Sequence, residues 1–444
     1  MFKKNNKISN GVKLKNKICV IGLWHLGCVV SSCLANAGYK VCGVDFTPEI
    51  INNLKKGKPP LYEPGLEELL VKNIKSKRIN FTDSFKDALD RANFIFLTFD
   101  TPVDEKDRLD LSLIYNGCKE IAKFAPQEFT LVIMSQMPVG TSKIIKEFIL
   151  KRNKTLSFKV VYNPENLMLG QALKRFTEPD RLIIGLENED IKEKIEKLYS
   201  FIKAPKIYMD LNSAEMVKHA INSYLAGSIS FINEIAGLCE VTGANAKKVA
   251  EGMKSDKRIG KYAFLNPGLG FSGGTLARDL RVLKEIGKCK GVKTQIIDSI
   301  MAVNQNQNKK IVKKIKNIFG SISKLNITIL GLTYKPGTST LRRSAALEIA
   351  KKLILYKANL KAFDPMVNTQ KIMTGLKIFK NPYDAVRNSD LVLLITEWPE
   401  FKNLNFSKIK KLMRKPVIID CKNFLDPKIL KDIGFDYYGV GVKN

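Results

Sequence analysis

Four glycines lie close together in the stretch Asn266–Leu280, which runs into a segment with the apolar spacing of a helix. Because glycine lacks a Cβ, this loop can turn sharply and bring its backbone close to a ligand. A glycine loop that opens into a helix presents free backbone N–H groups, which suit an anionic or polar ligand. Thr275, Arg278 and Asp279 stand where their side chains could reach such a ligand. The stretch predicts a binding site, and a tight structural turn is the alternative.

A lysine and an asparagine share one predicted helix. Ser213–Val241 has helical apolar spacing and few helix breakers, which predicts a helix about 40 Å long. Lys218 and Asn222 are four residues apart and therefore share one face of that helix. The long helix, with a second one after Asn245, indicates a central helical domain and a dimer interface. Taken without its neighbours, Lys218 is equally well explained as a solvated lysine of a Lys-rich chain.

The N-terminal region has the pattern of a dinucleotide-binding unit. A short apolar strand, Lys17–Ile21, leads into the glycine turn Gly22–Gly27, a helix, and a second strand, Tyr39–Val44, that ends at Asp45. An acid about 20 residues after the turn accepts hydrogen bonds from the adenosine ribose hydroxyls, which favours NAD. Trp24 replaces the second glycine of the pattern, the one that lets backbone approach the pyrophosphate. A βαβ unit that binds no nucleotide is the alternative.

Strands continue to alternate with helices along the chain. Further strands are predicted at Phe94–Phe99, Thr130–Ser135, Lys159–Tyr162, Leu182–Gly185 and Lys206–Tyr208, and after Lys324 at Ile327–Gly331, Leu360–Phe363, Asp390–Thr396 and Pro416–Asp420. This alternation is typical of a parallel, doubly wound sheet. We expect an α/β protein with two doubly wound Rossmann-like domains, 16–210 and 309–444, joined by a central helical domain, 211–308.

Composition excludes some classes of protein. The chain has 444 residues, too many for one hydrophobic core, and 45% of them are hydrophobic. It lacks an uncharged apolar run of about 18 residues, so we expect no membrane span, and Met1–Lys17 has no apolar core for a signal peptide. The 74 Lys and Arg against 43 Asp and Glu give a net charge of +31. Because these lysines are scattered over helical faces, we expect attraction of an anionic substrate and no nucleic-acid partner.

Cysteine and histidine usage points to no metal site. The eight cysteines form no CxxC pair and have no histidine at zinc-ligand spacing. A reducing cytoplasm fits this usage better than a disulfide framework does. His25, one of only two histidines, lies between Trp24 and Leu26 and is interpreted as a packing residue.

Several motifs occur together in a set order. They are Tyr62–Leu66, Asn163–Glu165, Pro179–Arg181, Ala214–Glu215 with Lys218 and Asn222, Ser230–Glu234, Asp256–Gly260, the glycine loop, Gly331–Pro336 with Arg342, Thr396–Trp398 and Asp420. In this order the chain resembles the UDP-glucose/GDP-mannose dehydrogenase family from about Lys17 to Gly441. Members of that family oxidise the C6 alcohol of a nucleotide sugar to a carboxylate in two NAD-dependent steps.

The resemblance implies a role for each matching residue. Lys218, assisted by Asn222 and Asp279, would hold a water and stabilise an oxyanion, and Glu165 would act as acid or base in the later hydrolysis. The NAD site would include Gly22, Trp24, Gly27, Asp45, Thr101, Gln136 and Arg342. The UDP- or GDP-sugar would be held by Arg258, Asn266, Gly268, Gly270, Phe271, Tyr334, Lys335 and Lys422. A homodimer is also implied.

The chain departs from the family pattern where the chemistry would occur. Thr275 stands at the position of the nucleophilic cysteine, so this is a variant that lacks the thiol for the second oxidation. Gln136 replaces a threonine, Leu169 a common acidic residue, and Lys422 an arginine with bidentate geometry. Cys289 is too far along its helix to substitute for the missing thiol.

Two hypotheses remain open. In the first, the protein is an NAD-dependent nucleotide-sugar 6-dehydrogenase that transfers one hydride, or two through a hydrated aldehyde. In the second, Thr275, Gln136 and Trp24 mark a non-catalytic protein that binds a nucleotide sugar or NAD. Thr275 is expected as a hydrogen-bonding site residue more than as a nucleophile.

Overall fold

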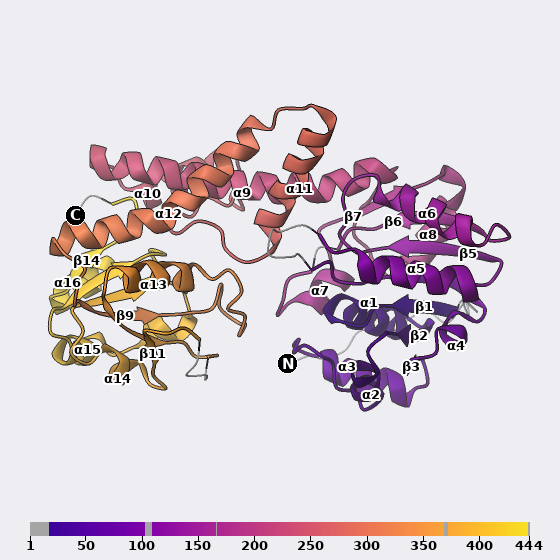
Figure 1. Cartoon of the computed structure of the whole chain (residues 1–444), viewed down its shortest axis with the longest axis horizontal. Helices are drawn as coiled ribbons and strands as arrows, with labels where there is room; N and C mark the ends of the chain where they lie inside the picture. Colours follow the sequence, from indigo (N-terminus) through magenta and orange to yellow (C-terminus); the bar gives the residue numbers. More distant parts are fainter. Residues whose placement is uncertain (1–16, 103–108, 166, 368–371, 443–444) are drawn as a thin grey trace. The chain divides into compact units, whose positions relative to one another are not determined.

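The computed structural model describes residues 17–102, 109–165, 167–367 and 372–442. The chain divides into two compact units, Met1–Lys218 and His219–Asn444, each with a sheet of its own (Figure 1). The boundaries expected for three domains stay predictions, and the N-terminal tail before Lys17 lies outside the described residues.

The first unit is organised around an eight-stranded sheet in the order β3-β2-β1-β4-β5-β6-β7-β8. The strands from β3 to β6 are parallel to one another, which confirms the doubly wound arrangement. The strands are β1 Lys17–Ile21, β2 Lys40–Val44, β3 Ile79–Thr82, β4 Ala92–Leu97, β5 Glu128–Ile133, β6 Ser157–Tyr162, β7 Leu182–Leu186 and β8 Lys206–Asp210.

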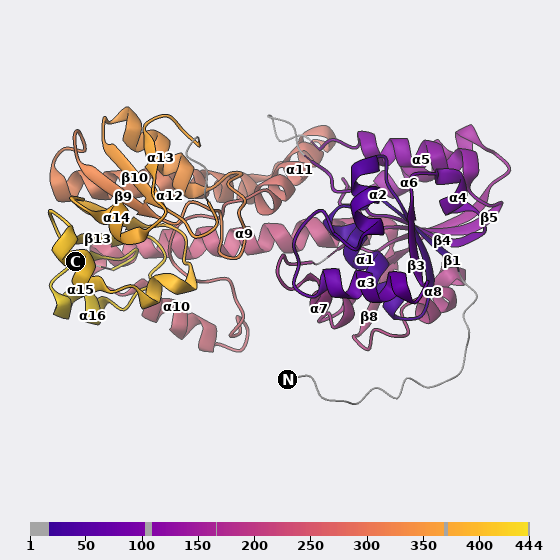
Figure 2. The same cartoon turned by 90° about the horizontal axis from the view of Figure 1, so that it is seen from below.

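Helices cover both faces of this sheet, which is why its central strands are apolar on both sides (Figure 2). Along β1, Ile18 and Val20 join one core, and Cys19 and Ile21 join the other. The first face packs against α1 His25–Asn36, α2 Pro48–Lys55, α3 Leu66–Lys75, α7 Ala172–Thr177 and α8 Lys192–Leu198. The second packs against α4 Phe85–Leu89, α5 Ser112–Phe124 and α6 Thr141–Arg152.

One strand pair departs from the parallel pattern. Strands β6 and β7 are antiparallel, with Tyr162 opposite Gly185, and β8 then runs parallel to β7. The apolar run Leu182–Leu186 carries no signal of its direction, because hydrophobic periodicity reports burial and does not distinguish a parallel from an antiparallel strand. Strand β3 was not predicted, because its two apolar residues alternate with polar ones and form no apolar run.

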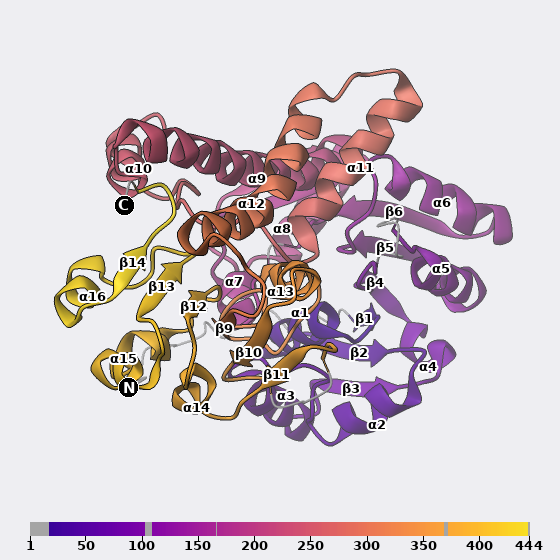
Figure 3. The same cartoon turned by 60° about the vertical axis from the view of Figure 1, so that its left-hand side comes forward.

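Four helices lie between the two sheets in the sequence: α9 Leu211–Thr242, α10 Ala246–Ser255, α11 Thr275–Lys290 and α12 Gln295–Phe319 (Figure 3). The continuous α9 confirms the long helix that the sequence predicts. The Asn245 side chain accepts the backbone N–H groups of Lys247 and Lys248 and so caps α10. Within the described ranges, no helix combines the length and apolarity needed to cross a bilayer.

The second sheet has six parallel strands in the order β11-β10-β9-β12-β13-β14. Its two faces pack against different helices, α12 with α13 on one side and α14, α15 and α16 on the other. The elements are β9 Asn326–Leu330, α13 Ala345–Leu355, β10 Asn359–Phe363, β11 Leu376–Ile378, α14 Pro382–Val386, β12 Leu391–Leu394, α15 Phe406–Leu412, β13 Val417–Asp420, α16 Pro427–Ile433 and β14 Asp436–Tyr438. This sheet confirms the second Rossmann-like fold; β11 and β14 are three-residue strands that the sequence did not predict.

Candidate active site

The glycine turn after β1 has the geometry that a dinucleotide requires. Gly22 has φ +93°, a conformation that side chains rarely adopt. A Cβ on Gly27 would lie 1.8 Å from the Gly22 carbonyl oxygen, so the first turn of α1 packs directly on the loop. The two glycines are therefore required by conformation and by space.

Asp45 closes this turn from the end of β2. The backbone N–H of Leu23 donates to Asp45 Oδ2 (2.6 Å), and the N–H of Thr47 donates to Oδ1 (2.9 Å). The carboxylate is 7% exposed. Each oxygen has further lone-pair capacity for a ribose hydroxyl. The residues of this turn thus fit NAD, as the sequence predicts.

Trp24 fits the turn without strain. Its φ of −78° and ψ of −153° are extended backbone, and its carbonyl accepts the N–H of Cys28 to start α1. The side chain is 42% exposed. Trp24 therefore places an indole on the surface of the turn, in a backbone conformation that does not require glycine.

His25 is part of a polar clamp that sequence reasoning missed. Its Nε2 lies 3.0 Å from Glu63 Oε2, and both side chains are largely buried. Glu63 also accepts the backbone N–H groups of Gly170 (2.9 Å) and Ala172 (2.8 Å). The clamp thus ties the start of α1 to the loop before α7. Only the motif Tyr62–Leu66 pointed to Glu63, and the partner 107 residues away is invisible in the sequence.

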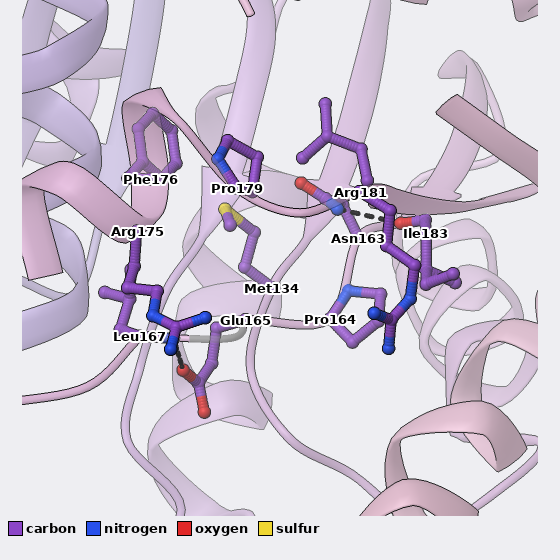
Figure 4. Close-up of a pocket in the computed structure, with 11 residues that line it drawn as sticks. Met134, Asn163, Pro164, Glu165, Leu167, Arg175, Phe176, Pro179, Arg181 and Ile183 are labelled. Carbon is purple, nitrogen blue, oxygen red and sulfur yellow. Dashed lines mark hydrogen bonds between the residues drawn. The ribbon is translucent and has the colours of Figure 1, made fainter. Parts of the chain in front are cut away.

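Glu165 and Lys218 lie together in the first unit. Lys218 Nζ donates to the backbone oxygen of Glu165 (2.6 Å) and lies 3.3 Å from its Oε1. Lys218 is 7% exposed, so it is not a solvated lysine. Glu165 also accepts the N–H of Leu167 and lines a small pocket with Arg175 and Arg181 (Figure 4). A fixed ammonium beside a carboxylate can stabilise an oxyanion and move a proton.

Two other predicted residues of the first unit follow strand ends. Thr101 comes after β4 and Gln136 after β5, and both are buried. The segment after Gln136 is held by Glu215 of α9, which accepts the backbone N–H groups of Gly140 (2.5 Å) and Ser142 (2.8 Å). The motif Ala214–Glu215 therefore serves to fix this loop and the start of α6.

Asp279 is the centre of a buried polar group in the second unit. Asn222 Nδ2 donates to Asp279 Oδ2, and His219 Nδ1 lies 3.1 Å from Oδ1. Arg278 Nε is 3.9 Å from the same Oδ1. The side chain of Asp279 is fully buried. Sequence reasoning brought Asn222 and Asp279 together and overlooked His219.

The glycine loop packs closely on its surroundings. Cβ atoms on Gly268 and Gly270 would lie 2.9 Å from the Cys421 oxygen and 2.1 Å from Asn304 Oδ1. Asn233 accepts the N–H of Gly268 (2.9 Å). The glycine loop is therefore packed against Asn233, Asn304 and Cys421, unlike a turn that is surrounded by solvent.

Phe271 and Tyr334 are held near each other by this loop. Asn304 Nδ2 donates to the Phe271 oxygen (3.1 Å), and Ser272 Oγ donates to the Tyr334 oxygen (3.3 Å). Gly273 has φ +79° and lies against the Tyr334 ring. The loop then opens into α11 at Thr275, which is exposed.

The cationic candidates of the second unit differ in burial. Lys422 Nζ lies 3.2 Å from Glu397 Oε2, so part of its charge is matched by a carboxylate of the same unit. Arg258 is exposed and pairs with Asp256 (2.6 Å), and Lys335 stands over the Tyr334 ring. Asn266 and Arg342 are exposed in loops; Asn266 accepts a hydrogen bond from Lys254. No group of three potential metal ligands occurs within the described ranges.

Family models match three consecutive parts of the chain. Residues 16–203 match the NAD binding domain of the UDP-glucose/GDP-mannose dehydrogenase family, residues 212–306 its central domain and residues 328–427 its UDP binding domain. The chain belongs to this family. As a UDP-glucose/GDP-mannose dehydrogenase family member, it carries the family's NAD-binding domain around the turn that holds Asp45.

Individual relatives span nearly the whole chain. UDP-glucose 6-dehydrogenase TuaD of Bacillus subtilis is 35% identical over 96% of this chain and 93% of its own. UDP-glucose 6-dehydrogenase of Rhizobium meliloti is also 35% identical, over 96% of this chain and 99% of its own.

Solved structures have the same fold. A UDP-glucose dehydrogenase from the hyperthermophilic archaeon Pyrobaculum islandicum has a TM-score of 0.89, with 28% identity over 98% of this chain and 100% of its own. A UDP-D-ManNAc dehydrogenase from Pyrococcus horikoshii has a TM-score of 0.85, with 26% identity over 96% and 99%.

Proposed function

We propose that this family member is an NAD-dependent oxidoreductase that oxidises the C6 hydroxyl of a UDP-sugar, with UDP-glucose as the first candidate. The observation that carries the proposal is the buried Lys218 ammonium beside Glu165, with 2.6 Å from Nζ to the backbone oxygen. The UDP binding domain and the relatives that act on UDP-sugars favour uridine over guanosine.

In the first oxidation, the C6 hydroxyl loses a proton and C6 loses a hydride, which gives an aldehyde. NAD, when bound, supplies the hydride acceptor. Lys218 stabilises the negative charge that develops on the C6 oxygen. Glu165, whose Oε1 is 3.3 Å from the ammonium, receives the proton.

The second oxidation is limited by Thr275. A threonine alkoxide does not form near neutral pH without a strong base, so a covalent adduct on this residue is disfavoured. Water can add to the aldehyde, and the resulting hydrate also carries a hydride on C6. We therefore propose that acid forms slowly, through the hydrate, and that aldehyde accumulates.

A second candidate function is binding of a nucleotide sugar or NAD without turnover. The exposed Thr275 and Trp24 favour it, because both replace residues that the family pattern uses for chemistry or for the pyrophosphate. This function predicts thermal stabilisation by the ligands and no NADH.

The test is NADH formed per sugar consumed, with purified protein, excess NAD and UDP-glucose, followed by mass analysis of the product. Between one and two NADH, with aldehyde present early, is the expected result. A prompt two NADH and a uronate would refute the limit set by Thr275. Absence of NADH with UDP-glucose and with a panel of other UDP- and GDP-sugars, while ligands still stabilise the fold, would favour the binding function.

A homodimer is part of the proposal. Tyr224, Phe231 and Leu238 are spaced by seven residues along α9 and are 74%, 52% and 56% exposed. This spacing gives one apolar stripe on the helix, and a second copy of the chain is the proposed occupant. The eight cysteines are free thiols, seven of them buried, which supports a reducing, cytoplasmic location.

A further inference from the structure

Each of the two histidines in this chain lies against a buried carboxylate. The His25 pair belongs to the clamp in the first unit, whereas the His219 pair involves Asp279, a predicted catalytic residue. We propose that His219 is a positioning residue that holds Asp279 for oxidation of the hydrated aldehyde. This inference rests on the proposed function.

The contact is well defined in space. His219 Nδ1 lies 3.1 Å from Asp279 Oδ1, and the two side chains are 1% and 0% exposed. Asn222, one turn further along α9, donates to the other oxygen, Oδ2. Residues three apart share a helix face, so α9 supplies a hydrogen-bonding partner to each oxygen of one carboxylate. These two contacts fix the rotation of the carboxyl group about its own axis.

The charge of Asp279 gives His219 its importance. A buried carboxylate is stable only when hydrogen bonds or positive charge replace its lost water. In the tautomer with its proton on Nδ1, His219 supplies one such bond, and the Arg278 guanidinium adds positive charge at 3.9 Å. Loss of the imidazole donor leaves Oδ1 without the bond that His219 supplies.

The position of Asp279 connects this pair to the reaction. Asp279 is four residues after Thr275 in α11, so the two share a face of that helix one turn apart. Where a cysteine would form a covalent adduct, this chain has a threonine, and the aldehyde must take up water instead. Oxidation of this hydrate removes a hydride from C6 and a proton from one hydroxyl, and a carboxyl group forms; NAD, when bound, would accept the hydride.

A carboxyl group held in a fixed orientation assists the loss of that hydroxyl proton. His219 acts through Asp279 and does not itself need to touch the sugar. The inference therefore predicts a fall in kcat for the aldehyde and little change in KM, because ground-state binding of the sugar is not altered.

The experiment compares His219→Phe with His219→Asn. Phenylalanine keeps a planar ring of similar volume without the donor, whereas the asparagine amide places an N–H near the position of Nδ1. The C6 aldehyde of UDP-glucose is supplied directly with NAD, and kcat and KM are measured. His219→Phe should lower kcat by about 10- to 100-fold, the effect expected for one lost hydrogen bond to a buried charge. His219→Asn should recover most of that loss, and KM should change less than about twofold in both variants.

Several results would overturn the inference. They are equal losses in the two variants, an effect on KM alone, unchanged kcat in His219→Phe, or no oxidation of the aldehyde by the wild type. If His219→Phe does not fold, wild-type kcat in His219→Asn supports the inference, and a loss of tenfold or more refutes it. If the wild type produces no NADH from any UDP- or GDP-sugar, the proposed function and the inference are refuted together. If the wild type is active and both His219 variants keep its kcat, the inference alone is refuted.

Discussion

The hydroxyl of a threonine is a much weaker acid than the thiol of a cysteine, and this difference decides the chemistry at residue 275. We predict that Thr275→Cys accelerates the second oxidation, because a thiolate adds to the aldehyde and holds a transferable hydride. NADH per sugar should rise to two, and the uronate should appear without an aldehyde lag. Mass analysis of early products measures the change.

The matched control at this position is Thr275→Ser. It keeps the hydroxyl and the start of α11, so its product distribution should stay that of the wild type. An equal product change in the serine variant would show that the thiol is not the cause.

Lys218 carries the prediction for the first oxidation. In Lys218→Met the stem is kept and the ammonium is lost, so kcat for UDP-glucose should fall about 100- to 1000-fold, as for removal of one oxyanion donor. Thermal stabilisation by NAD should persist, because the Asp45 turn is untouched. Lys247→Met, on an exposed position of α10, is the control and should behave as the wild type. A loss below tenfold in Lys218→Met would contradict the assigned role.

Residue contacts show where sequence reasoning stops. Asn222 and Asp279 could be predicted to act together because the family resemblance implies one site for both. His219 and Glu63 could not, because a single histidine or glutamate in a sequence carries no sign of its partner. Those partners lie 60 residues away for His219 and 107 for Glu63.

At the scale of elements, the two sheets share one arrangement, in which an aspartate after one strand accepts a backbone N–H from the turn after the neighbouring strand. Asp364 after β10 accepts the backbone N–H of Leu332 (2.7 Å), as Asp45 after β2 accepts that of Leu23. Gly331 has φ +89°, close to the +93° of Gly22. In the second unit, however, Trp398 Nε1 donates to the same Asp364 oxygen (3.1 Å). The sequence predicts the two strands that flank this turn in each half, whereas it does not predict the tryptophan partner.

Two glycines, Gly27 in the tight turn of the first unit and Gly252 in α10, should respond in opposite ways to an added Cβ. In Gly27→Ala the new Cβ meets the Gly22 oxygen, so stability should fall by about 1–3 kcal/mol and NAD should stabilise the fold less. In Gly252→Ala, inside α10, nothing lies within 4 Å of the new Cβ. Stability should there rise by up to about 1 kcal/mol, because alanine favours the helix. Urea unfolding with and without NAD measures both, and equal effects would refute the packing argument.

At the scale of the whole molecule, the order of strands and helices made the fold predictable from the sequence. Alternating strands and helices are compatible with only a few topologies, and these have a parallel sheet. This alternation did not predict the direction of β7. The chain passes from β6 through a loop and α7, as in a parallel crossover, yet β7 is antiparallel to β6. The net charge of +31 likewise predicts no fold, and it bears only on attraction of anionic ligands.

The apolar stripe on α9 carries the last prediction. If a second copy covers Tyr224, Phe231 and Leu238, then Phe231→Glu places a charge in the buried centre of that interface, which is strongly unfavourable. The wild type should have twice the mass of one chain by light scattering, and Phe231→Glu should shift toward one chain at micromolar concentration. Leu355→Glu is the matched control, because Leu355 is an 82% exposed leucine at the end of α13. A wild type with the mass of one chain, or a dimer that tolerates Phe231→Glu as well as Leu355→Glu, would assign the stripe to something other than self-association.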